Sequence, residues 1–288
     1  MQNQSRVTST VNPGATGDSQ QISFTTPNLS LQGQSIISAA TNGNGSAGNI
    51  QIQAADSVAL SNSTISTQVQ QNAIVPRNSS QTSTRSTANQ SNITIDTNLL
   101  TLDNGARITA NTNGQGDAGN ILVRNANTIA LNQSTISSAV GPNSTGQGGN
   151  INLNTNSLNL DNARISARTQ AQGRGGDITI TARDRINASN SDIETRSESS
   201  SSGNITVTAG DIRLRGDSDI RTQVNHRFQS CRKRILFCRI GIFLMSSVLL
   251  QAYWHKYIAA GVLPQVYHQA PNRRRYSLGE SPTCCLKA

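Results

Sequence analysis

The first 225 residues of the chain contain no cysteine, histidine, lysine, tryptophan or tyrosine, and Phe24 is their only aromatic residue. Without thiols or imidazoles, this stretch cannot form a zinc-type metal site, a Cys-His nucleophile or a disulfide scaffold. Of all 288 residues, only 34% are apolar and 3% aromatic, which is little for an ordinary globular core. The low apolar content favours an architecture other than a single large core.

The net charge of +9 is unevenly distributed along the chain. Residues 1–225 are neutral, with 14 arginines and 14 acidic residues, whereas residues 226–288 hold ten basic residues and one acidic residue, Glu280. Every cysteine, histidine, tryptophan and tyrosine also lies after residue 225. We therefore expect two parts of different chemistry, 1–225 and 226–288. The charge alone would suggest nucleic acid or a membrane as partner, but it belongs to the second part only.

A short phrase of Gly-Asn-Ile type recurs six times in the first part. Its Asn or Asp position is separated by 43, 28, 30, 27 and 27 residues, which gives a period of about 28 with one insertion. These positions are Asn49, Asn92, Asn120, Asn150, Asp177 and Asn204. The insertion predicts a loop over residues 69–90, which lacks the pattern and contains Pro76.

Each repeat contains three short segments in which apolar and polar residues alternate, as in 150–153, 158–160 and 164–167. Alternation with a period of two is typical of strands, and no helical periodicity is present. An isoleucine recurs once per repeat, at positions 36, 65, 108, 136, 165, 193 and 220. The pattern predicts an all-β fold, a parallel β-helix of about seven coils with three strands each, followed by an unrelated C-terminal tail.

Stacked coils explain two features of the repeat. One residue per coil in the same place would form a ladder, so we expect Asn49, Asn92, Asn120, Asn150, Asp177 and Asn204 to stack, with side chains bonding to the backbone and to each other. We expect the preceding glycine to supply a positive φ at the turn.

These residues resemble the repeats of filamentous-haemagglutinin-like large exoproteins, which are adhesins secreted by the two-partner route and abundant in cyanobacteria. Residues 103–112 and 116–121 are typical of that shaft, and the resemblance covers about residues 15–225. It implies a right-handed β-helix at the cell surface or outside the cell, which is concerned with adhesion. The implied partners are surface carbohydrate or cell-surface receptors, through the full-length protein, and the outer-membrane transporter of the family.

The family's N-terminal secretion domain, which the transporter recognises, has no counterpart here. Residues 1–5 also lack the basic and apolar regions of a signal peptide, so we do not expect this piece to be exported by itself. We therefore expect the chain to be a piece of a larger protein.

The tail begins where another Gly-Asn-Ile unit would be due. The abrupt change of composition favours a frameshift near codon 225, or a disordered tail. The apolar run 240–250 is too short to span a membrane, and no nucleic-acid-binding module surrounds Trp254 or the arginines at 273–275, so we expect neither partner. The spacing of Cys231, Cys238, Cys284 and Cys285 does not fit a zinc knuckle.

Several other motifs have a simpler explanation as loops. Residues 43–48 and 114–119 match the dinucleotide fingerprint, but each precedes a predicted strand instead of a helix. Residues 173–177 resemble half of a calcium-binding nonapeptide, but the nine-residue step is absent. Arg215, Gly216 and Asp217 form an integrin-type cell-attachment tripeptide, in a turn where other coils have Asp-Asn-Gly or Asn-Gln-Ser.

The sequence thus favours a non-catalytic shaft of a surface adhesin, with no cofactor, metal or catalytic residue. The alternative is a carbohydrate-active β-helix enzyme of the polysaccharide lyase or hydrolase type, which would gather carboxylates on adjacent coils. Asp103 and Asp161 occupy equivalent turns, but they are two coils apart with Asn132 between them. Asp217 and Asp219 lie in the last coil without such a cluster.

Overall fold

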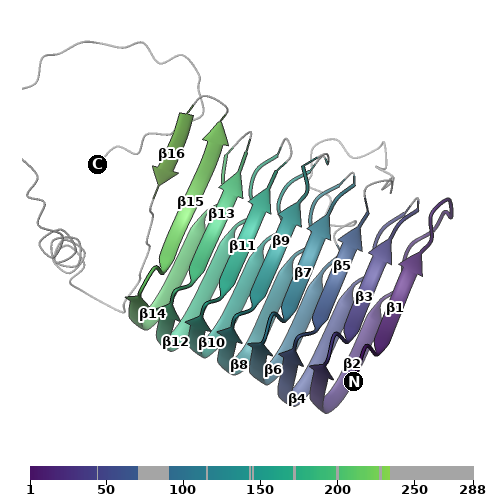
Figure 1. Ribbon diagram of the computed structural model, residues 1–288, viewed down its shortest axis with the longest axis horizontal. Helices are drawn as coiled ribbons and strands as arrows, with labels where there is room; N and C mark the ends of the chain where they lie inside the picture. The colour runs from purple at the N-terminus through teal and green to yellow at the C-terminus, as the bar shows by residue number, and fades with distance from the viewer. Residues whose placement is uncertain are drawn as a thin grey trace, which may run out of the picture. The chain divides into compact units, whose positions relative to one another are not determined.

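The computed structural model describes residues 1–226 and 229–233, with the exception of 44, 71–90, 115, 143, 145, 171–172 and 199–200 (Figure 1). Side chains are described as far as residue 224. All regular elements in these residues are strands.

Each coil consists of one long and one short strand. The long strands are β2 (Ile22–Gln32), β4 (Ile50–Ser61), β6 (Ile93–Asp103), β8 (Ile121–Asn132), β10 (Ile151–Asp161), β12 (Ile178–Ser189) and β14 (Ile205–Arg215). The short strands are β1 (Arg6–Val11), β3 (Ile36–Thr41), β5 (Thr64–Val69), β7 (Arg107–Thr112), β9 (Thr135–Val140), β11 (Arg164–Thr169), β13 (Asp192–Ser197) and β15 (Asp219–His226).

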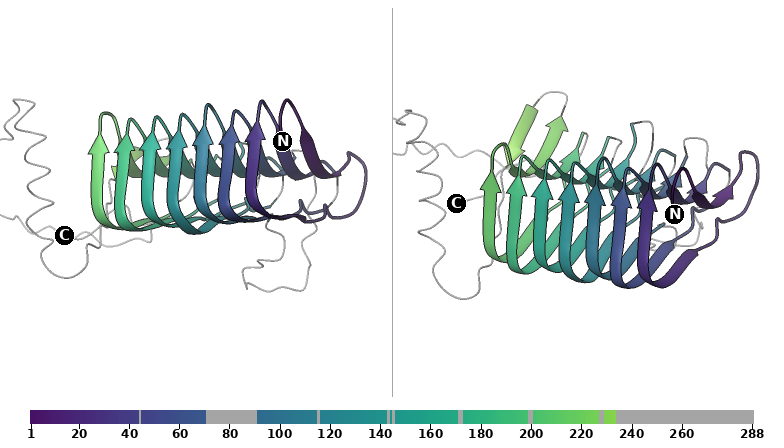
Figure 2. Two further views of the ribbon diagram at one scale, coloured as in Figure 1. Left: turned by 90° about the horizontal axis from the view of Figure 1, so that it is seen from below. Right: turned by 60° about the horizontal axis from the view of Figure 1, so that its bottom comes forward.

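The long strands form one parallel sheet and the short strands another, each in the order of the coils. Consecutive coils therefore lie on top of one another, as Figure 2 shows from two sides. Seven long strands alternate with short ones from β2 to β15, which confirms the predicted β-helix of about seven coils. Strand β1 adds a partial coil at the N-terminal end.

The prediction of three strands per coil is wrong, because the first two segments of each repeat are halves of one long strand. A register shift divides the halves, for example between Ala54 and Ser57 in the pairing of β4 with β6. Such a bulge bends a strand without ending its ladder of hydrogen bonds. The chain thus turns a corner of the coil inside a continuous strand, and the curve is visible in Figure 2.

The core is a stack of inward-facing aliphatic side chains. One column of the short sheet contains Ile37, Ile65, Ile108, Ile136, Ile165, Ile193 and Ile220. The predicted column began with Ile36, which pairs with Thr64 instead. The corner between β2 and β3 contains two residues with positive φ, Gly33 and Gln34, whereas the corner between β4 and β5 has only Asn62. Strand β3 therefore starts one residue later than the repeat pattern predicts. A one-residue shift moves a side chain to the other face of a sheet.

The tight corner between each long and short strand requires a left-handed backbone. Asparagine, which tolerates this conformation, occupies it at Asn62, Asn104, Asn162 and Asn190. Glutamine does so at Gln133 and glycine at Gly216. These corner residues are distinct from the predicted ladder residues, none of which has a positive φ.

Two predicted boundaries can be compared with the strands. Val69, which we assigned to the inserted loop, ends β5, and the N–H of Gln70 still donates to Thr41 of the coil before. Residues 71–90 lie outside the described part. At the other end, β16 (Gln229–Lys233) pairs antiparallel with β15, so five residues of the predicted tail form a strand. The remaining tail, 234–288, with its apolar run and three of its cysteines, lies outside the described residues.

Candidate functional site

The six repeated Asn and Asp residues form a continuous column along the stack. In each step the side-chain oxygen of one coil accepts a hydrogen bond from the backbone N–H of the equivalent residue in the next, at 2.8–2.9 Å between donor and acceptor. Asp177 takes the place of asparagine in one coil, and its Oδ1 also accepts a bond from Arg174 at 2.6 Å. The column joins the coils at the corner before each long strand.

The glycine before each ladder residue does not have the expected positive φ, so that prediction is wrong. Its role is to permit close approach between coils. A Cβ atom at Gly149 would collide with the backbone carbonyl oxygen of Gly119, and the same clash with the coil below applies at Gly48, Gly119, Gly176 and Gly203. Ser91 occupies this place in one coil, where its Oγ donates to the carbonyl of Ala47 at 2.6 Å.

A column of buried hydroxyl groups, which sequence reasoning missed, anchors the loops that close the coils. The Oγ of Ser138 donates to the carbonyl of Gly119 at 2.8 Å and accepts from the N–H of Gly149 at 3.0 Å. Thr67 and Thr195 donate instead to the carbonyls of Ser91 and Gly203, which precede the ladder residue of the next coil. The coils between them have Ala110 and Ala167 at this position. The signal in the sequence is a hydroxyl residue that alternates with alanine in the last apolar segment.

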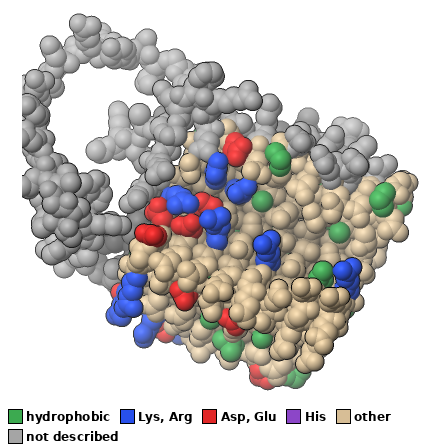
Figure 3. Space-filling model, in the orientation of Figure 1, with side chains coloured by type: hydrophobic (Ala, Val, Ile, Leu, Met, Phe, Trp, Pro, Cys, Tyr) green, Lys and Arg blue, Asp and Glu red, His purple; other side chains and the backbone are tan. Residues whose placement is uncertain are grey.

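Charged side chains gather over the outer face of β11, β13 and β15, where Figure 3 shows red and blue atoms together. Glu194 is the centre of this ion-pair cluster, with its side chain only 7% exposed. Its carboxylate lies 2.9 Å from the guanidinium of Arg221 and 3.9 Å from that of Arg164. Asp192 contacts both arginines at 3.4 Å, and Asp219 contacts Arg221 at 3.4 Å.

The cluster also fixes the charge of Arg221. Burial acts to lower the pKa of this guanidinium, but the hydrogen bond to Glu194 and the charges of Asp192 and Glu194 outweigh it and raise the pKa above its ordinary value. Because all five side chains are paired with one another, the cluster is suited to holding the last three coils together.

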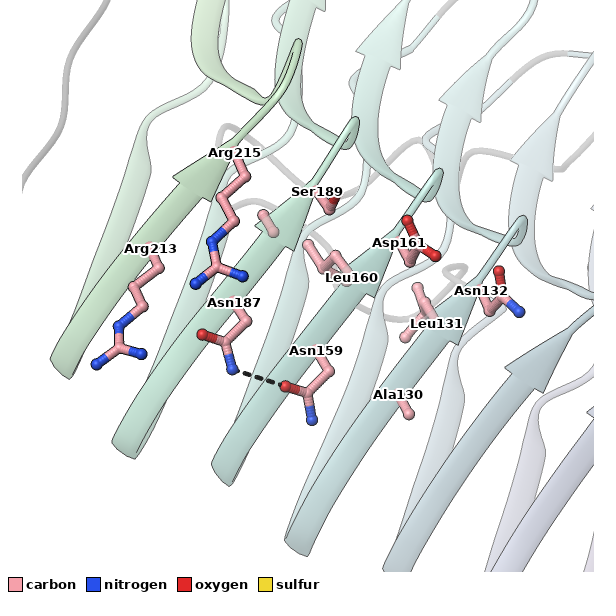
Figure 4. A pocket seen from close by; sticks show the side chains of 11 residues that line it. Ala130, Leu131, Asn132, Asn159, Leu160, Asp161, Asn187, Ser189, Arg213 and Arg215 are labelled. Carbon is pink, nitrogen blue, oxygen red and sulfur yellow. Dashed lines mark hydrogen bonds between the residues drawn. The ribbon is translucent and has the colours of Figure 1, made fainter.

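A shallow groove of about 280 Å³ crosses the outer face of β8, β10, β12 and β14 (Figure 4). Amide side chains of Asn159 and Asn187 lie along it, and Arg213 and Arg215 project from β14 at one end. Asp161 and Asn132 lie toward the other end. The groove therefore combines hydrogen-bonding amides with two guanidinium groups and one carboxylate.

The carboxylates considered for catalysis do not converge. Asp161 pairs in register with Asn132, and Asp103 lies one further strand away in the same column. With about 4.8 Å between neighbouring strands, their backbones are about 10 Å apart. That is near the upper limit for the two carboxylates of an inverting glycosidase and too far for a retaining one.

In the tripeptide, Arg215 ends β14 while Gly216 and Asp217 begin the turn to β15, and all three residues are exposed. Gly216 has a φ of 57°, and the N–H of Asp217 donates to Oδ1 of Asn190 at 3.3 Å. The turn thus follows the left-handed geometry of the other corners while its two charged side chains face solvent.

The glycine-rich loops lead into strands. The loop containing 43–48 precedes β4 and the one containing 114–119 precedes β8, so neither offers the helix N-terminus that a dinucleotide site needs. Asp177, part of the calcium-like motif, belongs to the ladder. Within the described residues no group of three or more acidic, His or Cys side chains could hold a metal ion.

No protein-family model, curated protein or solved structure matches this chain. In the described residues there is also no helix of sufficient length and apolar character to cross a membrane.

Proposed function

We propose that this chain is part of the shaft of a secreted surface adhesin similar to filamentous haemagglutinin, and that it has no catalytic role. The uninterrupted stacking of coils from β2 to β15 carries this proposal. Each coil is joined to the next by two parallel sheets and by the ladder of Asn and Asp side chains. Such a solenoid resists bending, so it holds distal binding regions at a distance from the cell.

The interior supports a mechanical role. One aliphatic core runs through all coils, and no buried side-chain polar atom in the described residues lacks a hydrogen-bond partner. Since each repeat contacts only its neighbours, coils can be added or removed while the rest keeps its structure. We further propose that the protein acts outside the cell, after passage through the family's outer-membrane transporter, and that surface carbohydrate or receptors bind the full-length protein.

The spacer role can be tested by adhesion of cells that produce the full-length protein. Deletion of residues 150–176 removes one complete coil and joins Gly149 to Asp177 and Ile178, which keeps a junction of the repeat type, so adhesion should be retained. Deletion of the whole repeat region should abolish it, because the binding regions are then close to the cell surface. Loss of adhesion in both strains, with equal surface amounts of protein, would contradict a spacer.

The competing hypothesis is a carbohydrate-active enzyme that uses Asp161 in the groove beside Arg213 and Arg215. The test is product release from acidic polysaccharides by the native chain and by the Asp161→Asn variant, with Asp184→Asn, at an exposed carboxylate outside the groove, as the matched control. We expect no turnover by any of the three. Turnover that Asp161→Asn abolishes would overturn the non-catalytic proposal.

A further inference from the structure

The groove on the outer face of β8, β10, β12 and β14 is open where a short side chain interrupts each of two columns of longer ones. Ala130 on β8 is short, whereas the equivalent residues on β10, β12 and β14 are Asn159, Asn187 and Arg213. In the neighbouring column, Ser189 lies between Asp161 and Arg215. A linear ligand could therefore lie along the stack and cross four strands in this depression.

The amides in the groove are held in place by each other. The Nδ2 of Asn187 donates to Oδ1 of Asn159 at 3.0 Å, which orients both side chains. In the described residues neither amide has another protein partner, so both N–H groups of Asn159, one N–H group of Asn187 and the carbonyl oxygen of Asn187 can bond to a ligand. Amides with free donors and acceptors bind hydroxyl groups well.

The end of the groove is positively charged. Arg213 is 56% exposed and uses Nε to contact Asp211 at 2.7 Å, which leaves its outer N–H groups open. Arg215 is exposed and has no ion pair within the part of the chain that the structure describes. In Figure 4 both arginine side chains extend from β14 beside Asn187. Guanidinium groups favour planar oxyanions, which they bind through paired hydrogen bonds.

From this arrangement we infer that the groove binds an anionic polysaccharide, whose acidic groups pair with Arg213 and Arg215 and whose hydroxyl groups bond to Asn159 and Asn187. No aromatic ring lines the groove, so a neutral sugar would have no ring to stack on. Its hydrogen bonds to the groove would be exposed to water and would contribute little to the binding free energy. This site goes beyond the spacer role, which requires no ligand on the shaft.

The test is isothermal titration calorimetry, in which the affinity of the full chain is measured separately for polygalacturonate, dextran sulfate and neutral dextran. We expect binding to one or both anionic polymers and not to dextran. The double variant Arg213→Gln/Arg215→Gln should bind at least about tenfold more weakly, and the affinity of the native chain should fall as salt increases. Binding to polygalacturonate would identify carboxylates as the recognised group, and binding to dextran sulfate alone would identify sulfates.

The basic tail requires a matched control because it can attract polyanions by itself. The double variant Arg6→Gln/Arg107→Gln removes the same charge from exposed arginines on the short sheet, so its affinity should be unchanged. Asn187→Ala removes no charge and should weaken binding several-fold. The inference would be overturned if the two double arginine variants lost affinity equally. It would also be overturned if the native chain bound neither anionic polymer. The spacer proposal would be unaffected.

Discussion

At the scale of single residues, the ladder explains why asparagine recurs once per coil. Only a short side chain with an acceptor oxygen can reach the N–H of the next coil from this corner, and both Asn and Asp meet that requirement. Leucine at this position would leave that N–H without an acceptor. Serine is one bond shorter than asparagine, so its hydroxyl oxygen would not reach the N–H. The residue type is therefore dictated by the stacking distance.

Substitution of one ladder residue should separate the role of the oxygen from that of the amide. Asn120→Ala leaves the N–H of Asn150 without an acceptor, which should lower the free energy of unfolding by about 1–3 kcal/mol. Asn120→Asp keeps the oxygen and should cost less than about 1 kcal/mol at neutral pH. Urea denaturation followed by circular dichroism measures both. If the two variants were equally destabilised, the oxygen would not be the essential group.

The glycine column should be less tolerant than any glycine in an open turn. Gly149→Ala forces a Cβ atom against the carbonyl oxygen of Gly119, so we expect a loss of about 3 kcal/mol or more. The matched control is Gly105→Ala, where the added methyl meets open space and the only cost is the left-handed backbone, about 1–2 kcal/mol. Thermal unfolding of the two variants compares these costs. A smaller loss at Gly149 than at Gly105 would contradict the close-packing account.

At the scale of strands, the repeat period and the alternation of apolar residues predicted the architecture correctly. They did not reveal that the first two segments of a coil are one strand, because a bulge changes register without leaving a gap in the sequence pattern. They also misplaced Ile36, since the first corner contains one extra residue. The role of Gly149 could not be read from the sequence, because its constraint comes from a different coil.

The ion-pair cluster and the groove also depend on contacts between coils. Glu194, Arg164 and Arg221 are separated by about one repeat each, and nothing in one repeat indicates that their side chains meet. Arg213 and Asn187 become neighbours only through the register of β12 with β14. Knowledge of the exact repeat alignment would have suggested both sets.

Neutralising Glu194 should loosen the last three coils. Glu194→Gln keeps the shape but removes the carboxylate charge between two arginines, so we expect a loss of about 1 kcal/mol, given that both arginines remain partly exposed. Amide hydrogen exchange should become faster in β13 and β15 and remain unchanged in β3 and β5. Asp211→Asn, which breaks an exposed pair with Arg213, is the control and should have no measurable effect. Faster exchange along the whole stack would indicate global destabilisation instead.

At the scale of the whole solenoid, stability and length both derive from repetition. No single coil could bury its apolar face alone, because ordering its backbone costs about 1–2 kcal/mol per residue. Stacking supplies the missing partner on each side and gives a structure whose length is set by the number of coils. The charged side chains are concentrated on the later coils, so the proposed binding groove lies on the later coils of the proposed spacer.

The distance between labelled coils tests the stacked architecture most directly. Ser30 and Asn187 lie in the same outer column, five strands apart, so spin labels at these sites should report a backbone separation of about 24 Å after the four tail cysteines are replaced by serine. Insertion of a second copy of residues 150–176 after Gly176 should lengthen it by one strand spacing, about 4.8 Å, with an unchanged strand spectrum. A separation that does not increase with the added coil would contradict the solenoid and the shaft built from it.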